Sequence, residues 1–193
     1  MTGQLFIISA PAGTGKTTLV HMLKDAYPNQ ITQSISCTTR KPRKGEIDGR
    51  DYVFLTEGAF GERVKKGNFL EYARVFGDHY GTLKEMVTSQ QTNGKDVILV
   101  IDTQGAIELK KKVKAIFIFI APPSMEILEE RLKNRKTEAP GTLKKRLKWA
   151  KHEMEQARLY DYTIVNNDLE TAYEALKSIV IAEKHREGGN HGA

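Results

Sequence analysis

The stretch Ala10-Pro-Ala-Gly-Thr-Gly-Lys-Thr17 decides how this 193-residue chain begins to fold. It follows the short apolar run Leu5–Ser9 and opens the segment Lys16–Ala26, whose apolar residues recur at helical spacing. A glycine-rich turn between a strand and a helix, closed by Lys-Thr, is the context of a phosphate-binding P-loop. Its glycines allow backbone N–H groups to converge on phosphate oxygens at the helix N-terminus. The stretch therefore predicts a strand, a phosphate-binding loop and a helix.

Two side chains of this loop predict nucleotide chemistry. Lys16 supplies a positive charge to the β- and γ-phosphates, and the hydroxyl of Thr17 can ligate Mg²⁺. The strict P-loop pattern begins with glycine, so Ala10 requires a negative φ. The alternative is a glycine-rich turn with an incidental lysine. The preceding strand, the spacing and the Lys-Thr pair favour the nucleotide site.

The rest of the chain alternates strand-like and helix-like segments. Val97–Ile101 and Ala115–Ile120 are apolar runs without polar alternation, which is typical of strands covered on both faces of a parallel sheet. Tyr162–Val165 is a weaker candidate strand. Helices are expected at Gln104–Lys111, after Ser124 as N-cap, at Leu143–Ala157 and after Asp168 as N-cap. This alternation predicts a doubly wound α/β core with a parallel sheet flanked by helices.

The pattern changes between residues 31 and 95, where short alternating segments surround a Gly- and Arg-rich stretch. This change predicts an α+β insertion on the core. A polar loop at 136–141 between two basic helices predicts a small helical lid. We expect one domain over residues 1–185, made of a core (1–30, 96–125 and 160–185), the insertion (31–95) and the lid (126–159), followed by a flexible tail at 186–193.

Charge and composition bound the possible partners. Lysine and arginine number 30 against 24 acidic residues, an excess compatible with nucleic acid, anionic membranes or phosphorylated small molecules. A single cysteine, Cys37, excludes an internal disulfide and is typical of a reducing compartment. No signal peptide is visible, and the longest uncharged apolar run, Ala115–Pro123, is too short to span a bilayer. We therefore expect a cytoplasmic protein without a membrane partner.

A second segment resembles a known family. Ser36-Cys-Thr-Thr-Arg-Lys-Pro-Arg-Lys-Gly-Glu-Ile-Asp-Gly-Arg-Asp-Tyr-Val-Phe54 is closely similar to the monophosphate-binding segment of guanylate kinases. The resemblance runs in family order from about Leu5 to Lys184 and includes Glu71, Tyr80-Gly-Thr82, Asp102-Thr-Gln-Gly105 and Ala121-Pro-Pro-Ser124. It implies a P-loop core, a GMP-binding insertion and a lid. It also implies Mg²⁺-dependent phosphoryl transfer from ATP to GMP, with dGMP as a second acceptor.

The resemblance also implies roles for matching positions. The ATP site would contain Ala10, Pro11, Ala12, Gly13, Thr14, Gly15, Lys16, Thr17, Thr18 and, near adenine, Asn166. The GMP site would contain Ser36, Arg40, Arg43, Glu46, Tyr52, Glu71, Tyr80, Thr82 and Asp102. Within it, Glu71 and Thr82 would recognise guanine. The catalytic charges would be Lys16, Arg40, Arg131, Arg135 and Arg146, and Thr17 would be the metal ligand.

Residue chemistry supports these roles independently. Arg40 and Arg43 flank Pro42, which stiffens the loop, so one short segment can present two guanidinium groups to a phosphate. The alternative is a solvated basic loop. Arg131 and Arg135 are four residues apart and share a helical face, although surface charge would also explain them. The acceptor phosphate has a second pKa near ~6, so its attacking oxygen is already ionised and no general base is needed.

Two positions depart from the family pattern, and three other functions are alternatives to the kinase. Val100 stands where the family usually has Asp, and Asn167 where it often has Asp. Asp102 alone could then serve Mg²⁺-bound water or guanine, or simply be a helix N-cap. A ribose-phosphate kinase, a phosphopeptide-binding scaffold module and a nucleic-acid binder are the alternatives. The intact P-loop favours ATP and GMP as partners over nucleic acid, and the chain is expected to be a monomer or a simple homo-oligomer.

Overall fold

The computed structural model describes residues 2–134 and 140–186 and contains two sheets. The larger has five parallel strands in the order β2-β7-β1-β8-β9. Its strands are β1 (Leu5–Ser9), β2 (Ile31–Gln33), β7 (Asp96–Val100), β8 (Ile116–Ala121) and β9 (Tyr162–Val165). The predicted α/β class with a parallel sheet is confirmed.

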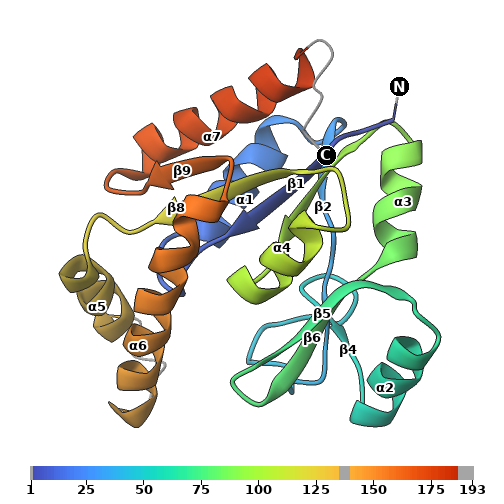
Figure 1. Ribbon diagram of the computed structural model, residues 1–193, viewed down its shortest axis with the longest axis horizontal. Helices are drawn as coiled ribbons and strands as arrows, with labels where there is room; N and C mark the ends of the chain where they lie inside the picture. Colours follow the sequence, from blue (N-terminus) through green and yellow to red (C-terminus); the bar gives the residue numbers. More distant parts are fainter. Residues whose placement is uncertain (1, 135–139, 187–193) are drawn as a thin grey trace.

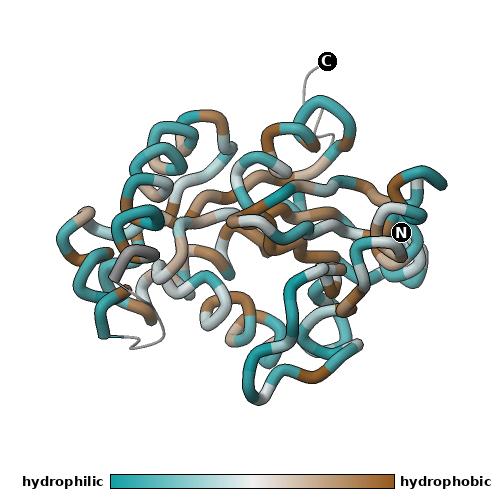
Figure 2. The backbone as a smooth tube through the Cα atoms, turned by 90° about the horizontal axis from the view of Figure 1, so that it is seen from below, coloured by the Kyte–Doolittle hydropathy of each residue, from teal (hydrophilic) through white to brown (hydrophobic). Residues whose placement is uncertain are grey.

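Helices cover both faces of this sheet because its strands are apolar on both sides (Figures 1 and 2). On one face, Phe6 and Ile8 of β1 pack with α1 (Lys16–Ala26) and α7 (Leu169–Lys184). On the other, Ile7 packs with α4 (Thr103–Lys110) and α3 (Lys84–Thr92). Burial of alternate side chains of one strand on opposite faces gives each helix layer its own apolar core.

The second sheet belongs to the insertion and has the order β4-β3-β6-β5. Its elements are β3 (Cys37–Thr38), β4 (Val53–Phe54), α2 (Glu57–Lys65), β5 (Phe69–Val75) and β6 (Asp78–Leu83). A small core of Cys37, Phe60 and Phe69 holds α2 against this sheet. Because β2 pairs with β7 in the larger sheet, the core extends beyond the boundary predicted at residue 30.

The predicted lid corresponds to α5 (Met125–Asn134), α6 (Pro140–Gln156) and a 3₁₀ turn (Ala157–Leu159). Helices α5 and α6 share a cluster of Leu128, Leu132 and Ala150. In Figure 1 this pair and the second sheet both lie below the core sheet. The predicted site residue Arg135, most of the predicted lid loop 136–141 and the predicted tail from residue 187 onward lie outside the described residues.

The two predicted N-cap residues, Asp168 and Ser124, cap the starts of α7 and α5. Asp168 Oδ1 accepts a hydrogen bond from the Thr171 N–H at 2.9 Å, and the Ser124 hydroxyl accepts one from Ile127 at 3.3 Å. Within residues 2–134 and 140–186, we find no helix with the length and apolar character needed to cross a membrane.

Candidate active site at the carboxyl edge of the core sheet

The predicted site residues gather where the parallel strands end. Lys16 follows β1, Ser36 follows β2, Asp102 follows β7 and Asn166 follows β9. Carboxyl ends of parallel strands lie at one edge of the sheet, which is where open α/β folds bind ligands. The topology therefore brings residues together that are up to 150 positions apart in the sequence.

The P-loop has the backbone that its glycines predict. Gly13 and Gly15 have φ values of 91° and 88°, in the left-handed region that favours glycine. Phe76 is the only non-glycine residue of the described chain with positive φ, so Ala10 meets the condition set for it. Lys16 is half-buried and donates from Nζ to the Ala10 carbonyl at 3.3 Å. The loop therefore has the backbone conformation that a phosphate-binding loop requires.

Asn166 lies against the P-loop. Its buried Nδ2 donates to the Thr14 carbonyl oxygen at 2.6 Å, and a Cβ at Gly15 would lie only 2.5 Å from that nitrogen. The Asn166 carbonyl accepts a hydrogen bond from Arg131 Nη1 at 3.0 Å. Asn166 thus joins the phosphate loop to α5, a role that its expected place near adenine did not include.

A cavity of about 250 Å³ lies between the core and the insertion. Nine predicted residues line it: Lys16, Thr17, Ser36, Arg40, Arg43, Tyr52, Glu71, Tyr80 and Asp102. Four apolar residues that were not predicted complete the lining: Ala73, Val75, Val100 and Ile101. Val100, which departs from the family pattern, therefore gives this wall a methyl surface in place of a carboxylate.

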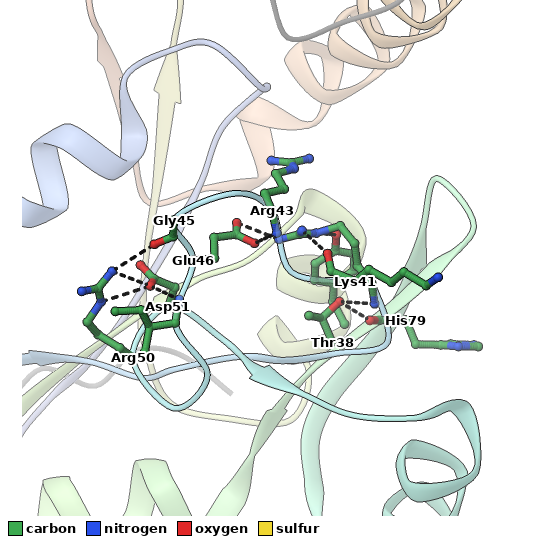
Figure 3. Close-up of polar contacts among 11 residues, drawn as sticks. Thr38, Lys41, Arg43, Gly45, Glu46, Arg50, Asp51 and His79 are labelled. Atoms are coloured by element: carbon green, nitrogen blue, oxygen red, sulfur yellow. Dashed lines mark hydrogen bonds and ion pairs between the residues drawn. The ribbon is translucent and has the colours of Figure 1, made fainter.

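Arg40 is held in place by neighbouring side chains. Its Nε donates to the Tyr80 hydroxyl at 3.2 Å, and its guanidinium carbon lies 5.3 Å from the Tyr52 ring centroid. Its Nη2 donates to Glu46 Oε1 at 2.9 Å, and Glu46 Oε2 accepts from the backbone N–H of Arg43 at 2.7 Å. Figure 3 shows the Glu46 carboxylate beside the backbone of Arg43, whose side chain extends away from it.

These contacts give Glu46 a role in positioning Arg40. Glu46 does not line the 250 Å³ cavity, but it lines a cavity of about 750 Å³ that shares Thr17, Ser36, Arg43 and Tyr52 with it. The hydrogen bond from Arg40 holds the pKa of the Glu46 carboxyl below its usual range. Glu46 therefore orients Arg40, whereas direct contact with an anionic substrate would bring two negative charges together.

A buried carboxyl also lines the 250 Å³ cavity. Glu71 on β5 is 5% exposed, and its Oε1 accepts a hydrogen bond from the Thr82 hydroxyl at 2.6 Å. Burial, with a contribution from Asp102, raises the pKa of Glu71 to about 7. A Cβ at Gly105 would lie 2.7 Å from Glu71 Oε2, so glycine there allows the carboxyl to lie against α4. The Thr82 hydroxyl, which was expected to recognise guanine, donates its proton to Glu71 in this structure.

Asp102 is a helix N-cap, and its second carboxyl oxygen leaves the ligand-binding interpretation open. Its Oδ1 accepts from the Gly105 N–H at 2.8 Å and caps α4. Its Oδ2 is buried without a hydrogen-bond partner, and Asp102 lines the same cavity as Lys16 and Thr17. Burial raises the pKa of the Asp102 carboxyl. One oxygen is structural, and the other can accept a ligand.

The lid adds two residues that sequence reasoning missed, Trp149 and Glu153, beside the predicted Arg146. Arg146, Trp149 and Glu153 recur at helical spacing on α6 and line a second cavity of about 150 Å³ together with Lys16. Glu153 is 4% exposed, and burial raises its pKa to about 7. Burial lowers the pKa of Lys16, while the negative charges of Glu153 and Asp102 raise it. Spacing relative to Arg146 was the available signal, but Glu153 stands in a helix rich in lysine and glutamate.

Comparison with known proteins agrees with this geometry. The guanylate kinase family model matches residues 2–183. The chain is 53% identical over 184 residues to the guanylate kinase of Protochlamydia amoebophila strain UWE25, covering 95% of this chain and 93% of that one. It is 49% identical to the guanylate kinase of Chlamydia muridarum, covering 95% and 89%.

Solved structures agree as well. The crystal structure of guanylate kinase from Anaplasma phagocytophilum matches with a TM-score of 0.79 and 34% identity, covering 96% of this chain and 88% of that one. The SH3-kinase fragment of tight junction protein 3 matches with a TM-score of 0.54 and 15% identity, covering 96% of this chain and 59% of that one, and shows the fold alone. The match to the family model over nearly the whole described chain, together with these identities, shows that the chain belongs to the guanylate kinase family.

Proposed function

We propose that this chain transfers the γ-phosphoryl group of ATP to GMP, forming ADP and GDP. One observation carries the proposal: a single cavity is lined by the P-loop Lys16, the phosphate-binding cluster around Arg40 and the buried Glu71. A phosphoryl donor, an acceptor phosphate and a base each find chemically matched residues there. Membership of the guanylate kinase family supports the same reaction.

The donor side is formed by the P-loop. Its amides cradle the phosphates, and Lys16 neutralises charge on the β- and γ-phosphates. The residues present fit Mg²⁺, because the Thr17 hydroxyl and the unpartnered Asp102 Oδ2 line the same cavity. Among the described residues, no three His, Cys, Asp or Glu side chains form a metal site, which suits an ion held mainly by nucleotide phosphates. When bound, Mg²⁺ would neutralise charge on the transferring phosphoryl group.

The acceptor phosphate would lie against Arg40. Glu46 and Tyr80 already hold its guanidinium group, so little side-chain freedom is lost on binding. Tyr52, Arg43 and Ser36 line the same wall and supply further donors. Catalysis then consists of positioning two polyanions and stabilising the charge between them, because the attacking oxygen of a phosphate is already ionised near pH 7.

Glu71 would recognise the base. Guanine presents N1–H and the exocyclic amine as adjacent donors, and an ionised carboxylate can accept from both. Adenine has an unprotonated N1 and would leave the buried carboxylate unpaired, which is costly. Thr82 would hold the carboxyl in this orientation through its 2.6 Å hydrogen bond.

The lid would close the site. We propose that Arg131 and Arg146 meet the transferring phosphoryl group and that closure excludes water, which would otherwise hydrolyse ATP. Arg131 now bonds the Asn166 carbonyl, and Arg146 lines the cavity next to Lys16. Arg135 is proposed for the same role on the resemblance alone.

The intact P-loop argues against a scaffold module, which would need only the phosphate-binding cluster. The buried Glu71 argues against a ribose-phosphate acceptor, which offers no base donors. We further propose a cytoplasmic location, where the buried Cys37 thiol stays reduced.

A coupled assay of ADP release tests the proposal directly. With ATP, GMP and Mg²⁺ we expect turnover, and chelation of Mg²⁺ by EDTA should abolish it. GDP should be identified as the second product. Binding of GMP without any GDP formation would refute the kinase function and favour a binding module.

A further inference from the structure

The turn between β5 and β6 has an unusual conformation. Phe76 lies in this turn with φ at 52°, is 57% exposed and is followed by Gly77 with φ at 105°. Bulky residues rarely adopt the left-handed region, and such conformations persist where surrounding structure supports them and often serve function. The conformation projects an aromatic ring from the tip of the hairpin.

The ring of Phe76 contacts the lid helix α6. Its centroid lies 6.4 Å from that of Trp149, with the rings at 68° in an edge-to-face arrangement. The guanidinium carbon of Arg146 lies 5.8 Å from the Phe76 ring centroid. Both geometries are attractive, the first between aromatic rings and the second between a cation and a ring face. Because Arg146 and Trp149 are three residues apart, one ring contacts two neighbours on the same helical face.

The hairpin that carries Phe76 also carries the acceptor-side residues. Glu71 lies on β5, and Tyr80 lies on β6. Phe76, Arg146 and Trp149 line the same 150 Å³ cavity as Lys16. The hairpin tip therefore connects the proposed guanine and phosphate sites to the lid residue that lies beside the P-loop lysine.

We propose that Phe76 is a positioning residue for phosphoryl transfer, which holds Arg146 of the lid at the transfer site. The inference rests on the proposed function, in which Arg146 meets the transferring phosphoryl group. The insertion and the lid are separate parts of the chain with separate apolar clusters. A contact between them fixes the position of Arg146 relative to the acceptor site, and rate depends steeply on such positioning.

The first test uses two substitutions of Phe76. Phe76→Asn removes the ring, and Asn is among the residues that best tolerate positive φ. Phe76→Tyr keeps the ring and is the matched control. We expect Phe76→Asn to lower kcat roughly tenfold, as loss of one cation–ring and one ring–ring contact predicts, with KM for ATP and GMP changed less than about twofold. Phe76→Tyr should keep kcat within about twofold of the parent.

Two further variants separate positioning from general damage to the fold. Trp149→Ala removes part of the same contact from α6 and should also lower kcat. In an Arg146→Ala background, Phe76→Asn should cause no further loss, because Phe76 acts through Arg146. Trp149 is the only tryptophan of the chain, so its emission reports the contact and should shift to longer wavelength in Phe76→Asn.

The outcomes distinguish the two proposals. Parental kcat in Phe76→Asn, or a loss that adds fully to that of Arg146→Ala, would overturn the positioning role while leaving GMP phosphorylation intact. Failure of the unmodified chain to form GDP would refute the proposed function, and the role of Phe76 with it.

Discussion

Replacing Glu71 by Gln should make the protein more stable and less active at the same time. The substitution keeps the shape of the side chain and an oxygen that can accept from Thr82, but it removes the charge. Glu71 is 5% exposed, and burial raises its pKa from 4.5 to about 7. The ionised form is therefore unfavourable in the folded protein without ligand.

Proton binding determines the sign of the change in stability with pH. The folded state binds the Glu71 proton more tightly than the unfolded state, so this group reduces the free energy of unfolding as pH rises from about 4.5 through about 7. The shift corresponds to about 3 kcal/mol at pH 8 and less than about 1 kcal/mol at pH 5. Glu71→Gln should therefore raise Tm by up to about 10 °C at pH 8 and much less at pH 5.

Activity should move in the opposite direction. An ionised carboxylate accepts from both guanine donors, and charge-assisted hydrogen bonds contribute about 1.5–3 kcal/mol. Glu71→Gln should therefore lower kcat/KM for GMP about 10- to 150-fold at pH 8, with little change in ATP affinity. Thermal melts and steady-state kinetics on the same samples measure both effects.

A matched control excludes a general effect of removing a carboxylate. Glu62 on α2 is exposed and does not line the cavity, so Glu62→Gln should change neither the Tm nor kcat/KM. Parental GMP turnover in Glu71→Gln, or an equal Tm shift at pH 5 and pH 8, would refute the reasoning.

Three other variants test separate parts of the site. Lys16→Met should abolish phosphoryl transfer while GMP binding persists in calorimetry, and loss of both would contradict the division between donor and acceptor sites. Asn166→Ala removes the buried hydrogen bond to the Thr14 carbonyl and should lower the free energy of unfolding in urea by about 1–3 kcal/mol. It should also weaken ATP binding, and an unchanged ATP affinity would show that Asn166 does not support the P-loop. Leu128 is fully buried between α5 and α6, so Leu128→Ala should lower the free energy of unfolding by about 2–5 kcal/mol, and an unchanged unfolding midpoint would contradict this.

The core of the fold could be predicted because its strands are continuous apolar runs and its loop carries conformational requirements. The boundary between the core and the insertion was harder to predict. Strand β2 is only Ile31–Gln33 and has one buried residue, so no periodic signal separated it from the short strands that follow. Strand β2 belongs to the larger sheet because it pairs with β7, and pairing between distant segments cannot be read from local residue spacing.

Within the site, sequence identified which residues gather but not which faces meet. Glu46 and Thr82 were both expected to contact GMP, and the structure shows in addition that they bond Arg40 and Glu71, which sequence did not indicate. Glu153 resembles a surface residue in the sequence, but it is buried and lines a cavity together with Lys16 because of how α6 packs. Such relations depend on how helices and loops pack in three dimensions.

The acceptor preference tests the central claim most directly. GMP, AMP, CMP and UMP at equal concentration compete for limiting ATP, and the diphosphates formed give the ratios of kcat/KM in one experiment. A site built around the buried Glu71 should favour GDP over ADP formed from AMP by roughly 10⁴-fold or more. Isotopically labelled AMP separates that ADP from the ADP released by ATP. Phosphorylation of AMP at a rate comparable to that of GMP would contradict the assignment of the cavity as a guanine site.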